Sequence, residues 1–213
     1  MTEQELRQQV KDAGVRLLKT HLTQGTWGNI SVRIDKDYML VTPSGLDYER
    51  LTPEMMVKVK IDTLEWEGNI KPTSEKKIHA QIYLNHPEVG AIIHTHPTNC
   101  GVIGCAKVEV PVMSEEQQKY IGGTIRTAKY GLSSTKKLTK NTVAALEGRM
   151  GCVMANHGIM CCGKDMEDAF ECCRVMEESA RAYINKCVTE KMGATEFSDD
   201  LFEKYFKKVK KIK

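Results

Sequence analysis

Long uninterrupted hydrophobic runs are missing from this sequence. Hydrophobic residues make up 41% of its 213 residues, but no stretch reaches the roughly 18 to 20 uncharged apolar residues that span a bilayer. The first segment, MTEQELRQQVKDAG, is polar and charged where a signal peptide would have an apolar core. We therefore expect a soluble, cytoplasmic protein, and the length predicts a single domain over residues 1–213.

Two further patterns are missing, a CxxC pair and a large excess of one charge. The eight cysteines include the doublets Cys161-Cys162 and Cys172-Cys173, which fit neither a thiolate zinc site nor a disulfide framework. We expect reduced thiols that pack as small apolar side chains. The 31 Lys and Arg residues nearly balance 28 Asp and Glu residues, so charge gives no reason to expect a nucleic-acid or membrane partner.

Helical periodicity is present in several parts of the chain. Apolar residues recur at three- and four-residue steps over residues 3–22, which predicts an opening amphipathic helix. A second helix is predicted to begin after Thr73 or Ser74, either of which can cap it, and Asp165 can cap a long third one. A basic C-terminal tail (about residues 200–213) has apolar residues at helical spacing, which favours a docked helix with a solvated basic face.

Strand-like segments lie between these helices. They are rich in β-branched residues and are broken by Gly, Asp and Pro, which is typical of antiparallel strands. The three early segments are NISVRI, DYMLVT and MVKVKID, at residues 29–34, 37–42 and 56–62. Two apolar runs, at residues 89–96 and 150–160, predict buried strands. With no repeat and no linker, the pattern predicts one layered α/β domain.

Three histidines form the clearest candidate for a metal site. His94 and His96 are separated by one residue at the end of a predicted strand, so both imidazoles should project from the same face. A catalytic zinc takes three protein ligands and keeps an open position, and His157 is the best third ligand because it stands where the second apolar run breaks into a glycine. The alternative is a set of ordinary surface or core histidines. His79, one turn after Glu75, could support the site or belong to the core.

Three loops have the composition of an anion site. Small hydroxyl or amide side chains stand beside glycines or prolines that let backbone N–H groups approach a ligand, and phosphate is the anion we expect. The residues concerned are Gly28, Asn29, Ser44, Gly45, Thr73 and Ser74. Glu75 follows the last loop directly and would lie between a phosphate and the metal, where a base is needed. Each loop could instead be an ordinary turn, and Glu75 an acidic residue in the first turn of a helix.

In this order and at these separations, the segments GTWGNIS, TPSG, PTSE, HTHP and NHG resemble the class II aldolase/adducin family. The resemblance implies a central, largely antiparallel β-sheet flanked by helices, one Zn²⁺ per subunit and a homotetramer. The implied zinc ligands are His94, His96 and His157. Glu75 is implied as the catalytic acid/base and as a possible metal ligand when no substrate is bound. The three loops are implied to bind the substrate phosphate.

Within this family, the resemblance implies a zinc-dependent aldolase. It would cleave a ketose 1-phosphate, such as L-fuculose 1-phosphate or a related deoxy-sugar phosphate, into dihydroxyacetone phosphate and an aldehyde. Glu rather than Asp at Glu75 favours aldol cleavage over pentulose-phosphate 4-epimerisation. A methylthioribulose-1-phosphate dehydratase and a non-catalytic adducin-like module are further alternatives, although the module would lack a complete histidine set. For the acid or base at the O4 oxygen, the candidates are Tyr120, Tyr205 and Glu115, from this subunit or a neighbouring one.

Overall fold

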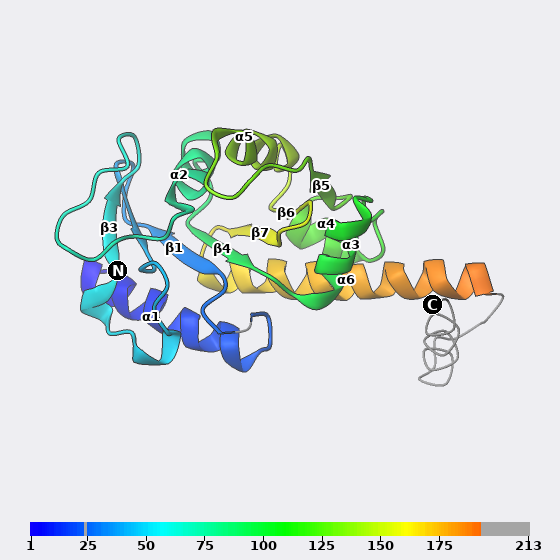
Figure 1. Ribbon diagram of the computed structural model, residues 1–213, viewed down its shortest axis with the longest axis horizontal. Coiled ribbons are helices and arrows are strands. Elements are labelled where there is room, and N and C mark those ends of the chain that lie inside the picture. The colour runs from blue at the N-terminus through cyan, green and yellow to red at the C-terminus, as the bar shows by residue number, and fades with distance from the viewer. Residues whose placement is uncertain (24, 193–213) are drawn as a thin grey trace, which may run out of the picture.

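The computed structural model describes residues 1–23 and 25–192, and its central element is a twisted β-sheet (Figure 1). The strands described are β1 (Asn29–Arg33), β2 (Tyr38–Val41), β3 (Val57–Lys60), β4 (Ala91–Thr95), β5 (Arg126–Ala128), β6 (Gly151–Met154) and β7 (Ile159–Gly163). Their order across the sheet is β3-β2-β1-β4-β7-β6-β5. Neighbouring strands are antiparallel except β5 and β6, which are parallel. The predicted, largely antiparallel sheet is confirmed.

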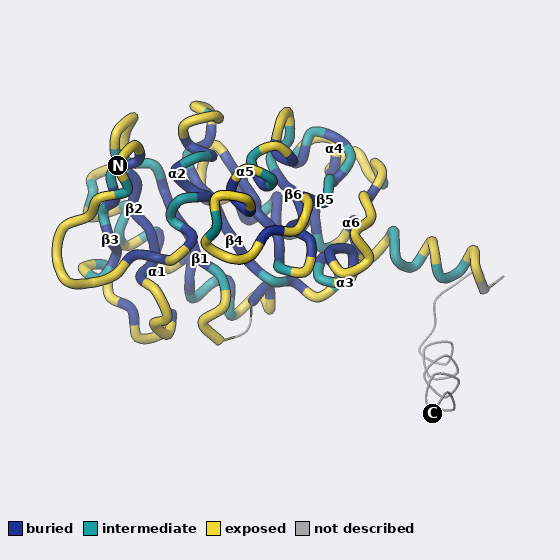
Figure 2. Tube along the Cα trace, turned by 45° about the horizontal axis from the view of Figure 1, so that its top comes forward, coloured by how far each residue is buried: buried dark blue, intermediate teal, exposed yellow. Residues whose placement is uncertain are grey.

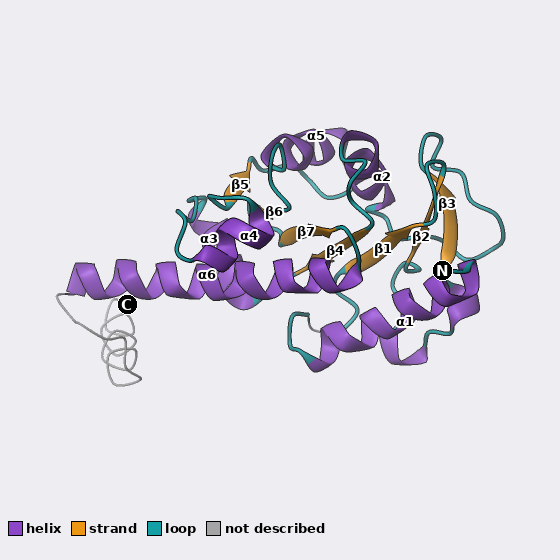
Figure 3. Cartoon of the chain, turned by 180° about the vertical axis from the view of Figure 1, so that it is seen from behind, coloured by secondary structure: helices purple, strands orange, loops and turns teal. Residues whose placement is uncertain are grey.

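Helices cover both faces of this sheet (Figures 1 and 3). The helices described are α1 (Glu3–Lys19), α2 (Lys76–Asn85), α3 (Thr98–Ala106), α4 (Glu115–Ile121), α5 (Lys136–Ala145) and α6 (Met166–Met192). Helices α1, α3, α4 and α6 pack on one face, and α2 and α5 pack on the other. The layered α/β fold class expected from the sequence is therefore confirmed.

Successive residues of the central strands alternate between two apolar cores. In β4, Ile93 packs into the core on the α1 and α6 side, whereas Ile92 packs into the core on the α2 and α5 side. Cys161 and Cys162 of β7 alternate in the same way. Side chains of a strand point to opposite faces, so a strand covered on both sides has an unbroken apolar sequence. Burial on both faces thus explains the apolar run at residues 89–96.

The second apolar run is two strands rather than one, which corrects the prediction for residues 150–160. It contains β6 and the start of β7, joined by a tight turn that carries His157. The backbone N–H of Met154 donates to the carbonyl oxygen of Gly158 (2.7 Å), and Asn156 takes a left-handed conformation (φ 55°). Asn156 and Gly158 are the sequence signals of this turn, but they lie inside a run that is otherwise apolar.

The predicted start of the second helix also needs correction. Helix α2 begins at Lys76, with Glu75 at the N-cap position and no side-chain capping hydrogen bond. Thr73 lies ahead of the helix, where its Oγ1 accepts from the backbone N–H of Glu75 (3.3 Å). Ser74 likewise caps nothing. The predicted cap of the long helix is confirmed, because Asp165 Oδ1 accepts from the N–H of Asp168 (2.9 Å) at the start of α6.

All eight cysteines lie within the described residues, and all are free thiols. Six are buried, in agreement with the sequence analysis: Cys100, Cys152, Cys161, Cys162, Cys172 and Cys173. Figure 2 shows β6 as mostly buried and the far end of α6 as intermediate to exposed. Burial raises the pKa of the Cys152 thiol well above its ordinary value. Cys105 and Cys187 are exposed.

The helix at the start of the chain is shorter than predicted, and the prediction for the end of the chain is not tested. The opening helix ends at Lys19 rather than at residue 22, and His21 then takes a left-handed conformation (φ 56°). The predicted basic tail, including Tyr205, lies outside the described residues. In the two stretches that the structure describes, no helix is long and apolar enough to cross a membrane.

Candidate active site

One pocket brings together the residues that the sequence analysis singled out. The three predicted anion loops and the histidine cluster line it, although they come from distant parts of the chain. The lining residues are Thr26, Trp27, Gly28, Asn29, Pro43, Ser44, Gly45, Thr73, Ser74, Glu75, His94, His96, Ser133 and His157. Antiparallel pairing makes this possible, because it sets Asn29 of β1 opposite His94 of β4. That the loops bind phosphate stays a prediction.

Three imidazoles converge on one side of this pocket. One ring nitrogen from each of His94, His96 and His157 lies within 4.8 Å of the other two. His94 is the last but one residue of β4, and its Nδ1–H donates to the carbonyl oxygen of Ile159 in β7 (2.8 Å). That hydrogen bond turns the Nε2 edge of the His94 ring toward the pocket, where Nε2 can act as a ligand.

Gly158 allows His96 to approach His157. The two rings stack with centroids 5.6 Å apart and an interplanar angle of 19°. A β-carbon at Gly158 would lie 2.5 Å from the carbonyl oxygen of Thr95 and would overlap the His96 ring. Close approach therefore requires glycine at the point where the β6–β7 turn meets the end of β4.

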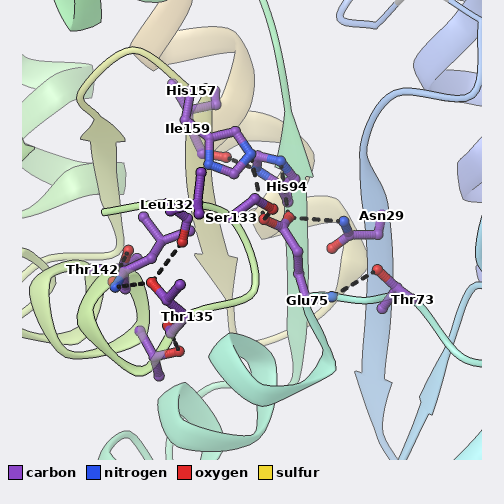
Figure 4. Close-up of polar contacts among 12 residues, drawn as sticks. Asn29, Thr73, Glu75, His94, Leu132, Ser133, Thr135, Thr142, His157 and Ile159 are labelled. Carbon is purple, nitrogen blue, oxygen red and sulfur yellow. Dashed lines mark hydrogen bonds and ion pairs between the residues drawn. The ribbon is translucent and has the colours of Figure 1, made fainter. Parts of the chain in front are cut away.

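Glu75 lines the pocket and lies beside His94 and His157 (Figure 4). Its Oε2 is 3.1 Å from His94 Nε2, and its Oε1 is 3.3 Å from His157 Nε2. The side chain of Asn29 donates to Oε2 (3.1 Å), and the hydroxyl of Ser133 donates to Oε1 (3.4 Å). Both carboxylate oxygens are thereby held by partners from separate elements.

Two opposing effects act on the pKa of Glu75. Burial alone would raise it, since a carboxylate is poorly solvated inside a protein. The neighbouring imidazoles of His94 and His157 and the hydrogen bond from Asn29 outweigh burial, and the pKa is lowered from its ordinary value. Glu75 is therefore ionised at neutral pH.

The donor set fits a divalent cation. Burial lowers the pKa of His96 to about 3 and also lowers the pKa of His157, so both rings are neutral, the form that binds metals. His96 Nδ1 is buried and has no hydrogen-bond partner in the described part of the chain. Three imidazole nitrogens beside a carboxylate suit a borderline metal ion that keeps an open coordination position.

Residues 8–184 match the family model described as Class II Aldolase and Adducin N-terminal domain. The chain belongs to the class II aldolase and adducin family. A 5-methylthioribulose-1-phosphate/5-deoxyribulose-1-phosphate aldolase of Rhodospirillum rubrum is 35% identical over 178 residues, which cover 84% of this chain and 80% of that protein. An L-ribulose-5-phosphate 4-epimerase of Salmonella paratyphi A is 33% identical over an alignment of 218 residues, which covers 95% of this chain and 94% of that protein.

The fold agrees with solved structures of this class II aldolase family. The structure of an L-fuculose 1-phosphate aldolase superposes with a TM-score of 0.81 at 32% sequence identity, covering 97% of this chain and 96% of that one. The relatives catalyse more than one reaction according to their names, so family membership leaves the specific reaction open.

One residue at this site was missed from the sequence, and a second was left with two alternatives. Ser133, after β5, contacts Glu75, and no local motif marks it. His79, for which the sequence left open a supporting role or a place in the core, is fully buried in α2 and contacts Asn29 and Ser31. Its spacing of four residues from Glu75, the N-cap residue of α2, is the signal that the sequence offers.

The candidates for the acid or base at O4 lie away from the pocket of this chain. Glu115 is exposed in the first turn of α4. Tyr120 packs partly buried against the core on the α6 side, with its hydroxyl 3.3 Å from Lys119 Nζ. Tyr205 lies outside the described residues. Among the described residues, neither Glu115 nor Tyr120 lines the pocket with Glu75.

Proposed function

We propose that this chain is a zinc-dependent aldolase that cleaves a ketose 1-phosphate into dihydroxyacetone phosphate and an aldehyde. The observation that carries the proposal is an ionised, buried carboxylate, Glu75, placed 3.1 Å from one imidazole of a metal-binding cluster and 3.3 Å from a second. Two relatives named above as sugar-phosphate aldolases, one of them with the same fold across nearly its whole length, support it.

His94, His96 and His157 would hold the cation. A divalent cation bound there would polarise the ketose carbonyl and stabilise the negative charge that develops as the carbon–carbon bond breaks. The three loops would bind the substrate phosphate through small side chains and backbone N–H groups. The start of α2 adds a favourable helix dipole for a dianion.

Glu75 would move the proton at C3. In the condensation direction, its ionised carboxylate removes a proton from C3 of dihydroxyacetone phosphate. In the cleavage direction, a base removes the O4 proton, the electron pair of the C3–C4 bond stays with the three-carbon fragment, and Glu75, after taking up a proton from solvent, donates it to C3. Asn29 and Ser133 keep the carboxylate in place for either direction.

A second subunit would complete the aldehyde side of the site. The proton on the O4 oxygen needs an acid or base, and the candidates Tyr120 and Glu115 do not reach the pocket within one chain. We propose that one of them, or Tyr205, reaches it from a neighbouring subunit of a homotetramer. The tetramer follows from the family resemblance.

A pentulose-phosphate 4-epimerase is the second candidate, favoured by the 33% identity to an L-ribulose-5-phosphate 4-epimerase. Product analysis separates the two. Zinc-loaded protein is incubated with L-fuculose 1-phosphate, 5-deoxyribulose 1-phosphate or L-ribulose 5-phosphate, and release of dihydroxyacetone phosphate is coupled to NADH oxidation with and without a chelator. Chelator-sensitive release supports the aldolase. Conversion of L-ribulose 5-phosphate to its C4 epimer, without release from the other two, overturns it.

Replacing the acid/base at position 75 gives a direct mutational test. Glu75→Gln keeps the size of the side chain but removes its basicity, so kcat should fall by about 10² to 10⁴. The metal content and the affinity for inorganic phosphate should stay close to wild type. Glu65→Gln, an exposed residue outside the pocket, is the matched control and should leave kcat unchanged. Normal turnover by Glu75→Gln would refute the assigned role.

A further inference from the structure

We propose that His79 is a positioning residue that fixes the side-chain amide of Asn29 and, through it, the carboxylate of Glu75. The inference rests on the proposed role of Glu75. His79 Nε2 lies 2.6 Å from Asn29 Oδ1, and Asn29 Nδ2 lies 3.1 Å from Glu75 Oε2. On the other side of the ring, His79 Nδ1 lies 2.7 Å from the hydroxyl of Ser31.

These contacts form a row of hydrogen bonds from Glu75 through Asn29 and His79 to Ser31. The charge state of Glu75 fixes which group donates in each of them. An ionised carboxylate only accepts, so Asn29 must turn its NH₂ group toward Glu75 and its carbonyl oxygen toward His79. That oxygen also only accepts, so His79 must carry its proton on Nε2. Burial lowers the pKa of His79 to about 3, so the ring is neutral and its Nδ1 is an acceptor.

The hydrogen bonds of Ser31 and Tyr83, at the other end of the row, have their directions fixed in the same way. Because Nδ1 of His79 accepts, the hydroxyl of Ser31 must donate to it. The hydroxyl of Tyr83, 2.9 Å from Ser31 Oγ, is then the donor to Ser31. Four side chains from β1 and α2 thus form one row in which each donates a hydrogen bond to the next and the last donates to Glu75. In order, they are Tyr83, Ser31, His79 and Asn29.

Burial makes the row rigid. His79 and Ser31 are fully buried, and Asn29 and Tyr83 are nearly so. If Asn29 turned its amide over, its Oδ1 would face Glu75 Oε2, and two acceptor oxygens would be left in contact inside the protein. His79 opposes that flip, because its Nε2–H can be satisfied only by the oxygen of Asn29.

Loss of the donor at position 79 should therefore misplace Glu75 without removing it. In His79→Leu, the buried Oδ1 of Asn29 loses its partner and the amide is free to turn. An error of about 1 Å in a reacting group can cost about 10²-fold in rate, and loss of an outer partner of a site typically costs about 10- to 100-fold. We expect kcat to fall in that range, with KM and metal content near wild type.

Two further variants separate positioning from general damage to the core. His79→Gln can still present an N–H to Asn29 and should recover most of the lost kcat. Tyr48→Phe removes a buried tyrosine hydroxyl that lies outside this row and has no hydrogen-bond partner in the described part of the chain, so kcat should stay close to wild type. Wild-type kcat in His79→Leu would overturn the proposal, as would equal losses in all three variants.

A measurement that needs no substrate tests the role of His79 independently of the proposed reaction. Heteronuclear NMR of the imidazole nitrogens in the metal-free protein should show His79 as the neutral Nε2–H form, assigned by its loss in His79→Gln. The Nε2–H signal should shift in Asn29→Ala. A proton on Nδ1, or no shift in Asn29→Ala, would overturn the inference. If the wild-type protein cleaves no ketose phosphate, the proposed function fails, and this spectrum still decides the hydrogen-bond row.

Discussion

Gly158→Ala should weaken the metal site while leaving the chain folded. Gly158 has no left-handed backbone angle, so alanine can adopt its conformation and the whole effect is steric. The new methyl group would stand 2.5 Å from the carbonyl oxygen of Thr95 and against the ring of His96. Overpacking of this kind typically costs about 1–3 kcal/mol.

The effect on metal affinity depends on whether Thr95 or His96 moves to relieve the overlap with the new methyl group. The carbonyl of Thr95 belongs to a strand held on both sides, whereas His96 lies just beyond the end of β4. We therefore expect His96 to move. If the whole strain is relieved by that movement, metal affinity should fall by about 5- to 150-fold, the equivalent of about 1–3 kcal/mol.

A competition titration against a chromophoric chelator measures this affinity, and thermal unfolding of the metal-free protein measures stability. Gly101→Ala is the matched control, because a β-carbon at Gly101 in α3 meets nothing within 4 Å. It should bind metal as wild type does, and it should be more stable by about 0.5–1 kcal/mol, since alanine is favoured over glycine inside a helix. Wild-type metal affinity in Gly158→Ala would refute the argument that this glycine holds His96 in place.

Two further predictions concern stability. The pKa of His79 is lowered from 6.5 to about 3, so below pH 6.5 the unfolded chain binds a proton that the native chain excludes. Urea unfolding of the metal-free protein should therefore show a stability that is retained above pH 6.5 and falls toward pH 3, by up to about 1.4 kcal/mol per pH unit from this group. The carboxylate of Glu177 accepts three hydrogen bonds of 2.7 to 2.9 Å from Asn99 and Cys100 at the start of α3. Glu177→Ala should cost about 1–3 kcal/mol in urea unfolding, whereas Glu178→Ala, which breaks an exposed pair with Arg174, should cost less than about 1 kcal/mol.

The histidine cluster could be predicted because its geometry is largely local. His94 and His96 flank one residue at a strand end, and strand alternation alone places their rings together. His157 needed a second inference, from the glycine that interrupts the second apolar run beside it. The pairing of β4 with β7, which sets His94 opposite Met160, is what brings them together.

The support behind Glu75 could not be predicted, because it depends on how α2 packs on β1. The contacts of Asn29 and Ser31 with His79 join residues 48 to 50 positions apart. No periodicity in either segment specifies that register. The same limit applies to the cap of α2, since Thr73 satisfies a backbone N–H ahead of the helix rather than the first turn itself.

The reactivity of the buried cysteines can be used to measure local unfolding of this protein. Six thiols lie in the core and two are exposed, so a thiol-reactive dye should label Cys105 and Cys187 at once and the others only when the chain opens. The rate of the slow phase then measures the opening free energy around β6, β7 and α6, which carry most of the buried thiols. Because His157 lies in the turn that joins β6 to β7, a bound metal should slow that phase in proportion to its occupancy. Labelling kinetics can thus follow the loading of the site with no substrate at hand.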